Sequence, residues 1–586
     1  MRFALLALTA ALLGAAQSPS TIRLPDTAWP VRYEAELTID PGQPELEGRM
    51  EIPVKFSAEQ SSLWMNAKDL TILAAAWDGD AAKFETVANE LLRVDLPHPS
   101  REGTLEIMYR ARLSDKGLLG AYRRQVAGLW YVFTTFTPIE ARRVFPCFDE
   151  PRFKAPWRLT LRVPKDLTAA ANYPAAHERM SGAWRTVEFA ETRPLPSEVI
   201  AFAVGPFDRY EGATAGVDHV PVRVLTPKGL SAAGREAAEA SDGVVRWLEN
   251  YTGQHYPWPK LDHVALPEGA FGAVENPGLI TYRQRGILAP ASGATPEWRR
   301  HMRNLQAHEL SHQWFGNLVT QADWTEVWLS EGFATFLAAK FAGDSLAIVS
   351  AREHLFDEDA GPRARPVRKT FTDRASLADV YSGVVYAKGA ATLAELESWL
   401  GAEALQNALR RYLTLHLGAN ATTADLAEAL GGGQSATVLS SMLDQTGVPH
   451  VRGELTCKAR VQAMLFGDRT EPVCYETDRA KKSCAVLQGG SLQIHSADET
   501  CPAWIFLNAG ARGYYRSVYT ARQMEALATQ AWPTLDAAER LTAVLDAVAQ
   551  LKDGSLTRDD VRPLAQAAAR DSVTRIAEAA KPLTSQ

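Results

Sequence analysis

The sequence predicts a multidomain α+β protein, and three observations support that class. The chain has 586 residues, which corresponds to about four domains at roughly 150 residues per domain. Its hydrophobic content of 46% and charged content of 22% are typical of globular proteins. Short β-like runs alternate with turns over residues 22–210, and segments with helical spacing of apolar residues follow them.

The N-terminus, MRFALLALTAALLGAAQS, has the pattern of a secretory signal peptide. Arg2 precedes an apolar run from Phe3 to Leu13, and small residues at 14–16 offer a cleavage site. We expect residues 1–16 to be removed and the mature protein to be periplasmic or secreted. The alternative is a buried N-terminal helix. No later window has about 18 uninterrupted apolar residues, so we expect no membrane span.

Sequence pattern divides the rest of the chain into four sections. Residues 17–210 show period-two alternation with Pro and Gly between the runs, which predicts a β domain. Residues 211–447 predict a mainly helical domain with a small sheet near its start. Residues 448–521 return to β patterning. Residues 522–586 are Ala-rich and predict a short helical segment, either of a compact protein or of a truncated product.

Charge gives little indication of partners. The net charge is −7 and the pI is near 6.0, without a concentrated block of Lys and Arg. A nucleic-acid surface needs such a basic stripe, so we expect no nucleic-acid partner. Nothing in the sequence indicates an oligomeric state.

Four of the five cysteines cluster within one section: Cys457, Cys474, Cys484 and Cys501. In an exported chain they favour two disulfides. The gaps between them contain no CxxC pair, which argues against the alternative of a zinc knot. Three connectivities are possible. The segment VCYETDRAKKSCAV is typical of a hairpin that would place Cys474 opposite Cys484, and this would leave Cys457 with Cys501.

The stretch QAHELSHQWFGN, residues 306–317, predicts a catalytic metal site. Side chains four apart on an α-helix share one face, so His308 and His312 can hold one zinc ion. Glu309 can lean over the metal as a general base without binding it. Glu331 follows His312 after 18 intervening residues, and this third ligand leaves one zinc position for water. The alternative is an ordinary helix that carries two histidines by chance.

Several motifs together resemble those of the gluzincin aminopeptidases, the aminopeptidase N family. HELSHQWFGN followed by WLSEGFA is similar to the family's zinc motif, and GAVEN at 272–276 resembles its GAMEN exopeptidase motif. YSGVVYAKG at 381–389 resembles its segment with the catalytic tyrosine. ARRVFPCFDEP at 141–151 and WIFLNAGARGYYRSVY at 504–519 resemble segments of its first and third domains. The resemblance implies a thermolysin-like catalytic domain over 211–447 and a small β-sandwich over 448–521.

The resemblance also implies a role for each candidate residue. Glu309 would be the general base, and Tyr386 would donate a hydrogen bond to the oxyanion. Glu275 would pair with the free α-ammonium of a peptide substrate, which sets cleavage one residue from the N-terminus. The backbone around it would run extended along the substrate, in the segment Gly272, Ala273, Val274, Glu275 and Asn276. One Zn²⁺ per chain would be bound by His308, His312 and Glu331.

The sequence departs from the family where the substrate amine is expected to bind. The family's N-terminal domain usually contributes a Glu or Gln there, and alignment on ARRVFPCFDEP places Thr137 at that position and Thr135 at the usual Gln. Val274 replaces the usual Met. Two alternatives to an aminopeptidase follow: a zinc peptidase or related hydrolase without strict exopeptidase control, and a catalytically inactive peptide-binding protein.

Overall fold

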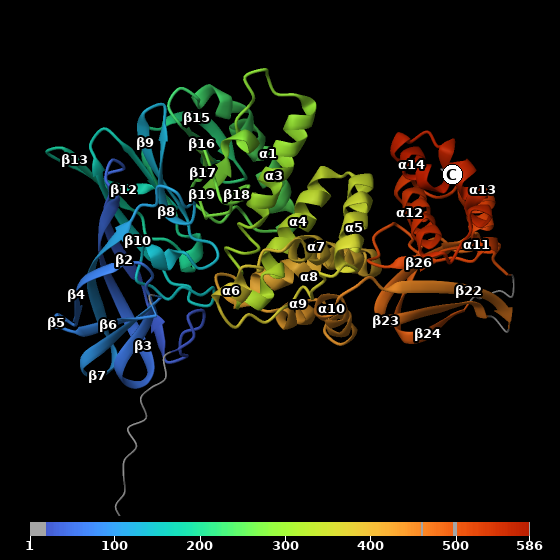
Figure 1. Ribbon diagram of the computed structural model, residues 1–586, viewed down its shortest axis with the longest axis horizontal. Coiled ribbons are helices and arrows are strands. Elements are labelled where there is room, and N and C mark those ends of the chain that lie inside the picture. Colours follow the sequence, from blue (N-terminus) through green and yellow to red (C-terminus); the bar gives the residue numbers. More distant parts are fainter. Residues whose placement is uncertain (1–18, 89, 459–460, 496–500, 585–586) are drawn as a thin grey trace, which may run out of the picture.

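The computed structural model describes residues 19–88, 90–458, 461–495 and 501–584 (Figure 1). The N-terminal strands lie at one end, the C-terminal helices lie at the other, and a helical section connects them. The expected signal peptide, residues 1–16, falls outside the described residues. Within the described part, no helix is both long and apolar enough to span a membrane.

Two long strands organise the N-terminal section. β3 (Glu45–Asn66) and β7 (Leu91–Arg112) pair antiparallel, and buried and exposed residues alternate along much of β3, as its sequence pattern predicts. The larger sheet has the order β12-β13-β10-β2-β3-β7-β4-β5, with β1 on β3 and β6 on β7, and the smaller sheet has the order β11-β14-β9-β8. The other bounds are β1 (Ala28–Pro30), β2 (Tyr33–Thr38), β4 (Thr71–Trp77), β5 (Asp80–Ala81), β6 (Lys83–Val87), β8 (Gly120–Val126), β9 (Leu129–Thr135), η1 (Ala141–Arg143), β10 (Trp157–Pro164), β11 (Thr168–Ala171), β12 (Ala175–Ser181), β13 (Trp184–Phe189), η2 (Ser197–Val199) and β14 (Phe202–Gly205).

A mixed sheet and a group of helices form the middle section. The sheet has the order β15-β16-β17-β19-β18, and β18 pairs antiparallel with β19 at the sheet edge. The strands are β15 (Asp208–Ala215), β16 (Val220–Thr226), β17 (Leu261–Leu266), β18 (Ala273–Val274) and β19 (Leu279–Arg283), with the short pair β20 (Thr320–Gln321) and β21 (Asn420–Ala421). The helices are η3 (Ser231–Gly234), α1 (Arg235–Thr252), α2 (Gln284–Ile287), α3 (Pro296–Ser311), η4 (Trp324–Glu326), α4 (Trp328–Ala342), α5 (Ser345–Asp359), α6 (Arg374–Leu377), α7 (Gly383–Leu400), α8 (Ala402–Leu415), α9 (Thr423–Ala429) and α10 (Gln434–Asp444).

The section predicted as a β-sandwich, residues 448–521, places its strands in a sheet with the order β24-β23-β22-β26, and β25 pairs with β23. Apolar residues of this sheet, such as Leu465 and Leu487, share a core with Leu541 and other residues of the C-terminal helices. The layer that covers the sheet is therefore helical. The bounds are β22 (His450–Lys458), β23 (Val461–Thr477), β24 (Ser483–His495), β25 (Ile505–Phe506), β26 (Arg516–Val518), α11 (Ala521–Ala526), η5 (Leu527–Ala531), α12 (Ala537–Asp553), α13 (Arg558–Ala569), α14 (Thr574–Ala579) and α15 (Lys581–Thr584).

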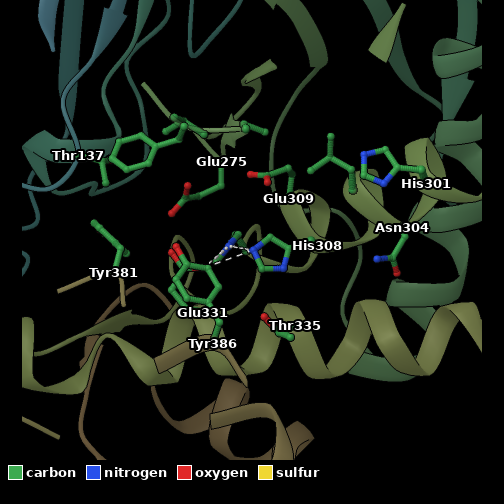
Figure 2. A pocket seen from close by; sticks show the side chains of 16 residues that line it. Thr137, Glu275, His301, Asn304, His308, Glu309, Glu331, Thr335, Tyr381 and Tyr386 are labelled. Atoms are coloured by element: carbon green, nitrogen blue, oxygen red, sulfur yellow. Dashed lines mark hydrogen bonds and ion pairs between the residues drawn. The ribbon is translucent and has the colours of Figure 1, made fainter. Parts of the chain in front are cut away.

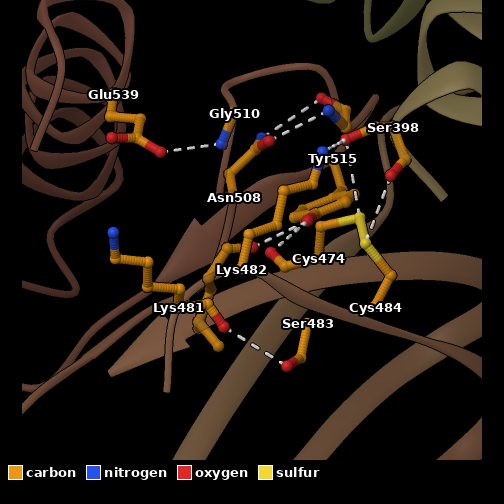
Figure 3. Close-up of a disulfide and its surroundings, with 12 residues drawn as sticks. Ser398, Cys474, Lys481, Lys482, Ser483, Cys484, Asn508, Gly510, Tyr515 and Glu539 are labelled. Atoms are coloured by element: carbon orange, nitrogen blue, oxygen red, sulfur yellow. Dashed lines mark hydrogen bonds between the residues drawn. A yellow bond between two sulfur atoms is a disulfide. The ribbon is translucent and has the colours of Figure 1, made fainter. Parts of the chain in front are cut away.

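The predicted Cys474–Cys484 disulfide is confirmed. The two cysteines are partners in the β23–β24 register, with their Cα atoms 4.0 Å apart. Ser398, near the end of α7, donates a hydrogen bond to Cys474 Sγ at 3.5 Å (Figure 3). The disulfide thus lies where the third section meets α7. The second predicted pair, Cys457–Cys501, involves a side chain outside the described part of the chain.

The predicted multidomain α+β class is confirmed, and the sections are joined by apolar packing. One continuous core runs from the N-terminal sheets into the helices of the middle section. A second core joins the third section to the C-terminal helices and includes Val349 of α5. Because the first core spans two sections, residues from both can contribute to one rigid site.

Two glycines allow helices α4 and α7 to approach closely. A Cβ built on Gly332 of α4 would lie 3.0 Å from the backbone Cα and C atoms of Gly389 in α7. Glu331 immediately precedes Gly332, and Tyr386 lies one turn before Gly389. The contact between the two glycines therefore brings the Glu331 and Tyr386 side chains to the same place.

Gly332→Ala should lower the midpoint of thermal unfolding. Overpacking α4 against α7 costs about 1–3 kcal/mol, which exceeds the gain in helix propensity of about 1 kcal/mol. Gly243→Ala is the matched control, because Gly243 is exposed in α1 and a Cβ there meets nothing within 4 Å, so its midpoint should rise. Calorimetry on both variants measures the difference. An unchanged or higher midpoint for Gly332→Ala would contradict the tight contact.

Candidate active site

Three candidate metal ligands converge at the end of α3. The helix begins at Thr295, whose side chain accepts a hydrogen bond from Trp298 N at 3.1 Å. At its other end, His308 Nε2 and His312 Nε2 lie 3.2 Å apart. Each of these nitrogens lies 3.3 Å from Oε2 of Glu331 on α4. The structure therefore brings together the three residues that the sequence singled out.

The separations between these ligand atoms fit a metal ion. A tetrahedral zinc ion with bonds of about 2.0–2.1 Å holds its ligand atoms about 3.3 Å apart. The Glu331 Oε2 atom is buried and forms no hydrogen bond, although both imidazoles face it. A buried acceptor between two ring nitrogens is stabilised by a shared cation. The donor set of two imidazoles and one carboxylate thus fits a catalytic zinc site.

Ser330 holds the His312 ring in the orientation that metal binding requires. The His312 Nδ1 atom lies 2.8 Å from Ser330 Oγ, and the Ser330 hydroxyl donates to the Phe315 carbonyl at 3.3 Å. Ser330 Oγ therefore accepts from Nδ1–H, which leaves the Nε2 lone pair facing the metal position. Gly316 has a φ of 127°, and a Cβ there would lie 2.4 Å from Ser330 Oγ. Glycine is required at this position by both backbone conformation and space.

The charged groups of the site shift one another's pKa values. Burial alone would lower the pKa of His312, but the Glu275 and Glu331 carboxylates outweigh it and raise that pKa to about 10. Burial alone would raise the pKa of Glu331, but the charge of His312 and the closeness of both imidazole rings lower it to about 2. A proton and a metal ion therefore compete for the same imidazole.

Glu309 and Tyr386 flank the predicted ligands, as Figure 2 shows. Burial raises the pKa of Glu309 well above its usual value. The charge of His312 lowers this pKa, whereas the charges of Glu275 and Glu331 raise it further. Burial also raises the pKa of Tyr386, and the charges of Glu331 and Glu275 raise it further. The Tyr386 ring stacks on His308 with centroids 6.0 Å apart. Tyr386 thus remains a hydrogen-bond donor beside the predicted metal position.

Glu275 follows an edge strand that is available for pairing. β18, residues Ala273–Val274, pairs with β19 on one side and ends the sheet order. The Glu275 carbonyl accepts hydrogen bonds from Gln313 Nε2 at 2.9 Å and Asn317 Nδ2 at 2.8 Å. Both side chains belong to the metal-binding stretch, so the two predicted motifs are hydrogen-bonded together. An extended peptide could add to the open edge of β18 as a further strand.

A cleft of about 450 Å³ connects these groups. Its lining includes the expected ligands together with Gly272, Ala273, Val274, Glu275, Glu309, Tyr386 and Thr137, and also His301, Asn304, Thr335 and Tyr381. Asn276 is buried next to this segment and does not line the cleft. Thr137 enters from the N-terminal section (Figure 2). The cleft thus combines residues from two sections of the chain.

Two residues of the site had no predicted role. Glu198 lies in the short 3-10 helix η2, outside the motifs that resemble those of the family, and Ser330 lies within the WLSEGFA segment, where only Glu331 was singled out. Burial raises the pKa of Glu198 well above its usual value, and the charges of Glu275, Asp149 and Glu331 act in the same direction. The proximity of Glu198 to Glu275 arises from the tertiary fold.

Comparison with known proteins agrees with this geometry. Residues 236–445 match the peptidase family M1 domain, and residues 29–199 match the peptidase M1 N-terminal domain. The chain is 34% identical over 553 residues to Aminopeptidase M1-A of Oryza sativa subsp. japonica, an alignment that covers 87% of this chain and 63% of the relative.

Similarity extends to other plants and to an animal. The chain is 30% identical over 549 residues to Aminopeptidase M1 of Arabidopsis thaliana, covering 85% of this chain and 62% of the relative. It is 27% identical over 552 residues to glutamyl aminopeptidase of Sus scrofa, covering 86% of this chain and 58% of the relative. The chain thus spans about three fifths of the length of these relatives.

Ser330→Ala should weaken zinc binding by about 10–100-fold, because His312 loses the hydrogen bond that fixes its tautomer. The ligands themselves are unchanged, so the variant should still bind one ion. Competition titration against a chromophoric zinc chelator measures the dissociation constant. Ser350→Ala, on α5, is a control that should bind zinc as the wild type does. Equal affinities for wild type and Ser330→Ala would refute the orienting role.

Zinc binding to the metal-stripped protein should release about one proton at pH 7. His312, with a pKa raised to about 10, carries a proton there, and zinc requires the neutral imidazole. Apparent affinity should therefore fall about tenfold for each pH unit of acidification from pH 8 to pH 6. Calorimetric titrations in buffers of different ionisation enthalpy count the protons. Binding without proton release would contradict the assigned charge state.

Proposed function

Because the chain belongs to the M1 family of peptidases, we propose that it is a zinc-dependent aminopeptidase that removes N-terminal residues from peptides. One observation carries the proposal: the three predicted metal ligands share a single cleft with Glu309 and Glu275. The ligands and Glu309 provide a metal centre with a general base, and Glu275 provides a negative charge near it. A peptidase that recognises a free N-terminus needs all three.

The metal chemistry depends on a small set of side chains. His308, His312 and Glu331 would hold one zinc ion per chain, which would supply the Lewis acidity that lowers the pKa of water toward about 7. The Glu309 carboxylate takes the proton of the attacking water and later passes it to the departing amine. The Tyr386 hydroxyl donates a hydrogen bond to the substrate carbonyl oxygen as negative charge develops there.

Selection for a free N-terminus comes from Glu275. Its carboxylate pairs with the α-ammonium of the substrate, while the peptide backbone lies along β18. The hydrogen bonds from Gln313 and Asn317 to the Glu275 carbonyl support this role, because they fix the strand relative to the metal-binding helix. The scissile bond is then placed one residue from the bound ammonium.

Export of the mature protein is part of the same proposal. The signal-peptide pattern of residues 1–16 supports it. The Cys474–Cys484 disulfide supports it independently, because disulfides persist in oxidising compartments such as a periplasm or the exterior. The substrates would then be peptides outside the cytoplasm.

Glu309→Gln should lower kcat by about 10²–10⁴-fold, because the amide cannot accept the proton of the attacking water. Zinc content should stay near one per chain, since Glu309 is not a ligand. Hydrolysis of a panel of aminoacyl 4-nitroanilides, together with metal quantification by mass spectrometry, measures both. Unchanged turnover by the variant would rule out Glu309 as the base.

The wild-type enzyme should hydrolyse the free aminoacyl substrates about 10–100-fold faster than their N-acetylated counterparts. Acetylation removes the positive charge that Glu275 binds, and a charge-assisted hydrogen bond of this kind contributes about 1.5–3 kcal/mol. The same panel provides the comparison. Equal rates on both sets would contradict the exopeptidase proposal.

A further inference from the structure

Glu198 is a buried carboxylate with an oxygen that lacks a partner. It lies in η2 of the N-terminal section, and its side chain is 5% exposed. Its Oε1 atom accepts a long hydrogen bond of 3.4 Å from Gln321 Nε2, and its Oε2 atom has no hydrogen-bond partner. Burying such an oxygen costs free energy unless a donor or a cation reaches it.

A small side cavity lies against Glu198. The polar residues that line it are Glu198, Glu275, Glu331, Tyr381, Asn317, Gln321 and Ser330. Glu275, Glu331 and Tyr381 also line the main cleft, so the side cavity opens beside the predicted metal position. Its free volume of about 10 Å³ is close to what a single water-sized group needs.

The lining of this cavity offers acceptors and negative charge. Three carboxylates surround it, and no Lys, Arg or His is among its described lining residues. The side-chain oxygens of Asn317 and Gln321 also lack partners, because their NH₂ groups are used on Glu275 O and Glu198 Oε1. The complementary group is therefore a small cation with several N–H donors, and a primary ammonium has three.

Spacing favours an ammonium over a second metal ion. Within the described residues, two groups of three side chains place their ligand atoms close enough to share a metal ion. One group is His308, His312 and Glu331, and the other is Glu275, Glu309 and His312. Glu198 belongs to neither group. An ammonium binds through hydrogen bonds of about 2.8 Å, so it bridges carboxylates that stand farther apart than metal ligands do. The α-ammonium of a peptide in the main cleft can enter the side cavity while its Cα stays outside.

We propose that Glu198 is the second carboxylate that binds the substrate's free α-ammonium, together with Glu275. This inference rests on the proposed aminopeptidase function and assigns a specificity residue to it. Thr137, where an amine anchor was expected, carries no charge, and its hydroxyl donates to the Glu198 carbonyl at 3.4 Å. Thr137 thus supports the backbone of η2, while Glu198 supplies the charge.

Paired ligands that differ by the amine alone test this assignment. L-leucine hydroxamate and its des-amino analogue, 4-methylpentanehydroxamic acid, share the metal-binding group and the side chain. In the zinc-loaded full-length protein, Glu198→Gln should weaken binding of L-leucine hydroxamate by about 10–100-fold. Binding of the des-amino analogue should change by less than about twofold. Calorimetry measures both without requiring turnover.

A matched variant controls for the loss of a buried carboxylate. Glu471→Gln removes a carboxyl group that is 2% exposed and carries an unpartnered oxygen in β23, outside the cleft, so it should change neither affinity. If Glu198→Gln does not fold, Glu198→Asp replaces it, with a smaller but still amine-specific loss expected.

Equal weakening of both ligands by the Glu198 variant, or weakening of neither, would overturn the assignment of Glu198. Hydrolysis of free aminoacyl substrates by the wild type would leave the proposed aminopeptidase function standing in that case. Failure of the wild type to distinguish the two hydroxamates would instead count against amine recognition as a whole, including the role of Glu275.

Discussion

Negative charge held away from water is the constraint on which this cleft depends. Glu198, Glu309 and Glu331 are each no more than 5% exposed, and Glu275 stands among them. Buried carboxylates are stable when cations or donors compensate them. The imidazoles compensate part of this charge, since the pKa of His312 is raised and that of Glu331 is lowered. In the proposed function, a divalent metal and a cationic substrate would supply the remainder, so binding them would also balance the charge of the cleft.

The fold satisfies this constraint by bringing distant segments into contact at positions without bulk. Gly332 and Gly389 let α4 and α7 meet at backbone distance, and Gly316 leaves room for Ser330 beside His312. Gln313 and Asn317 extend from the metal-binding stretch to hold the Glu275 carbonyl. The stretch that carries the imidazoles therefore also positions Glu275 and the strand β18 that precedes it. A shift of this stretch would move the imidazoles and Glu275 together, which keeps the distance between them fixed.

Local pattern explains what could be predicted from the sequence, and long-range contact explains what could not. His308 and His312 follow from helical period alone, and the Cys474–Cys484 pair follows from a hairpin. Resemblance to a family was needed for Tyr386 and Glu275, whose local sequence is ordinary. Glu198 has no such signal, because its contact with Gln321 joins residues 123 positions apart. The helical layer over the third sheet was likewise decided by tertiary packing.

The proposed recognition of the amine draws on two sections of the chain, whereas the proposed metal chemistry draws on one. The predicted metal ligands belong to the middle section, as do Glu309, Tyr386 and Glu275, whereas Glu198 and Thr137 come from the N-terminal section. In the proposed aminopeptidase, strictness for a free N-terminus would therefore depend on how firmly the two sections are joined. Lys154 of the N-terminal section donates to the Asn317 and Leu318 carbonyls at 3.1 and 3.0 Å, and one apolar core continues across the junction. Because Asn317 also holds Glu275, this junction fixes both carboxylates relative to each other. In the proposed aminopeptidase, loosening this junction would relax the preference for a free N-terminus before it altered peptide-bond cleavage.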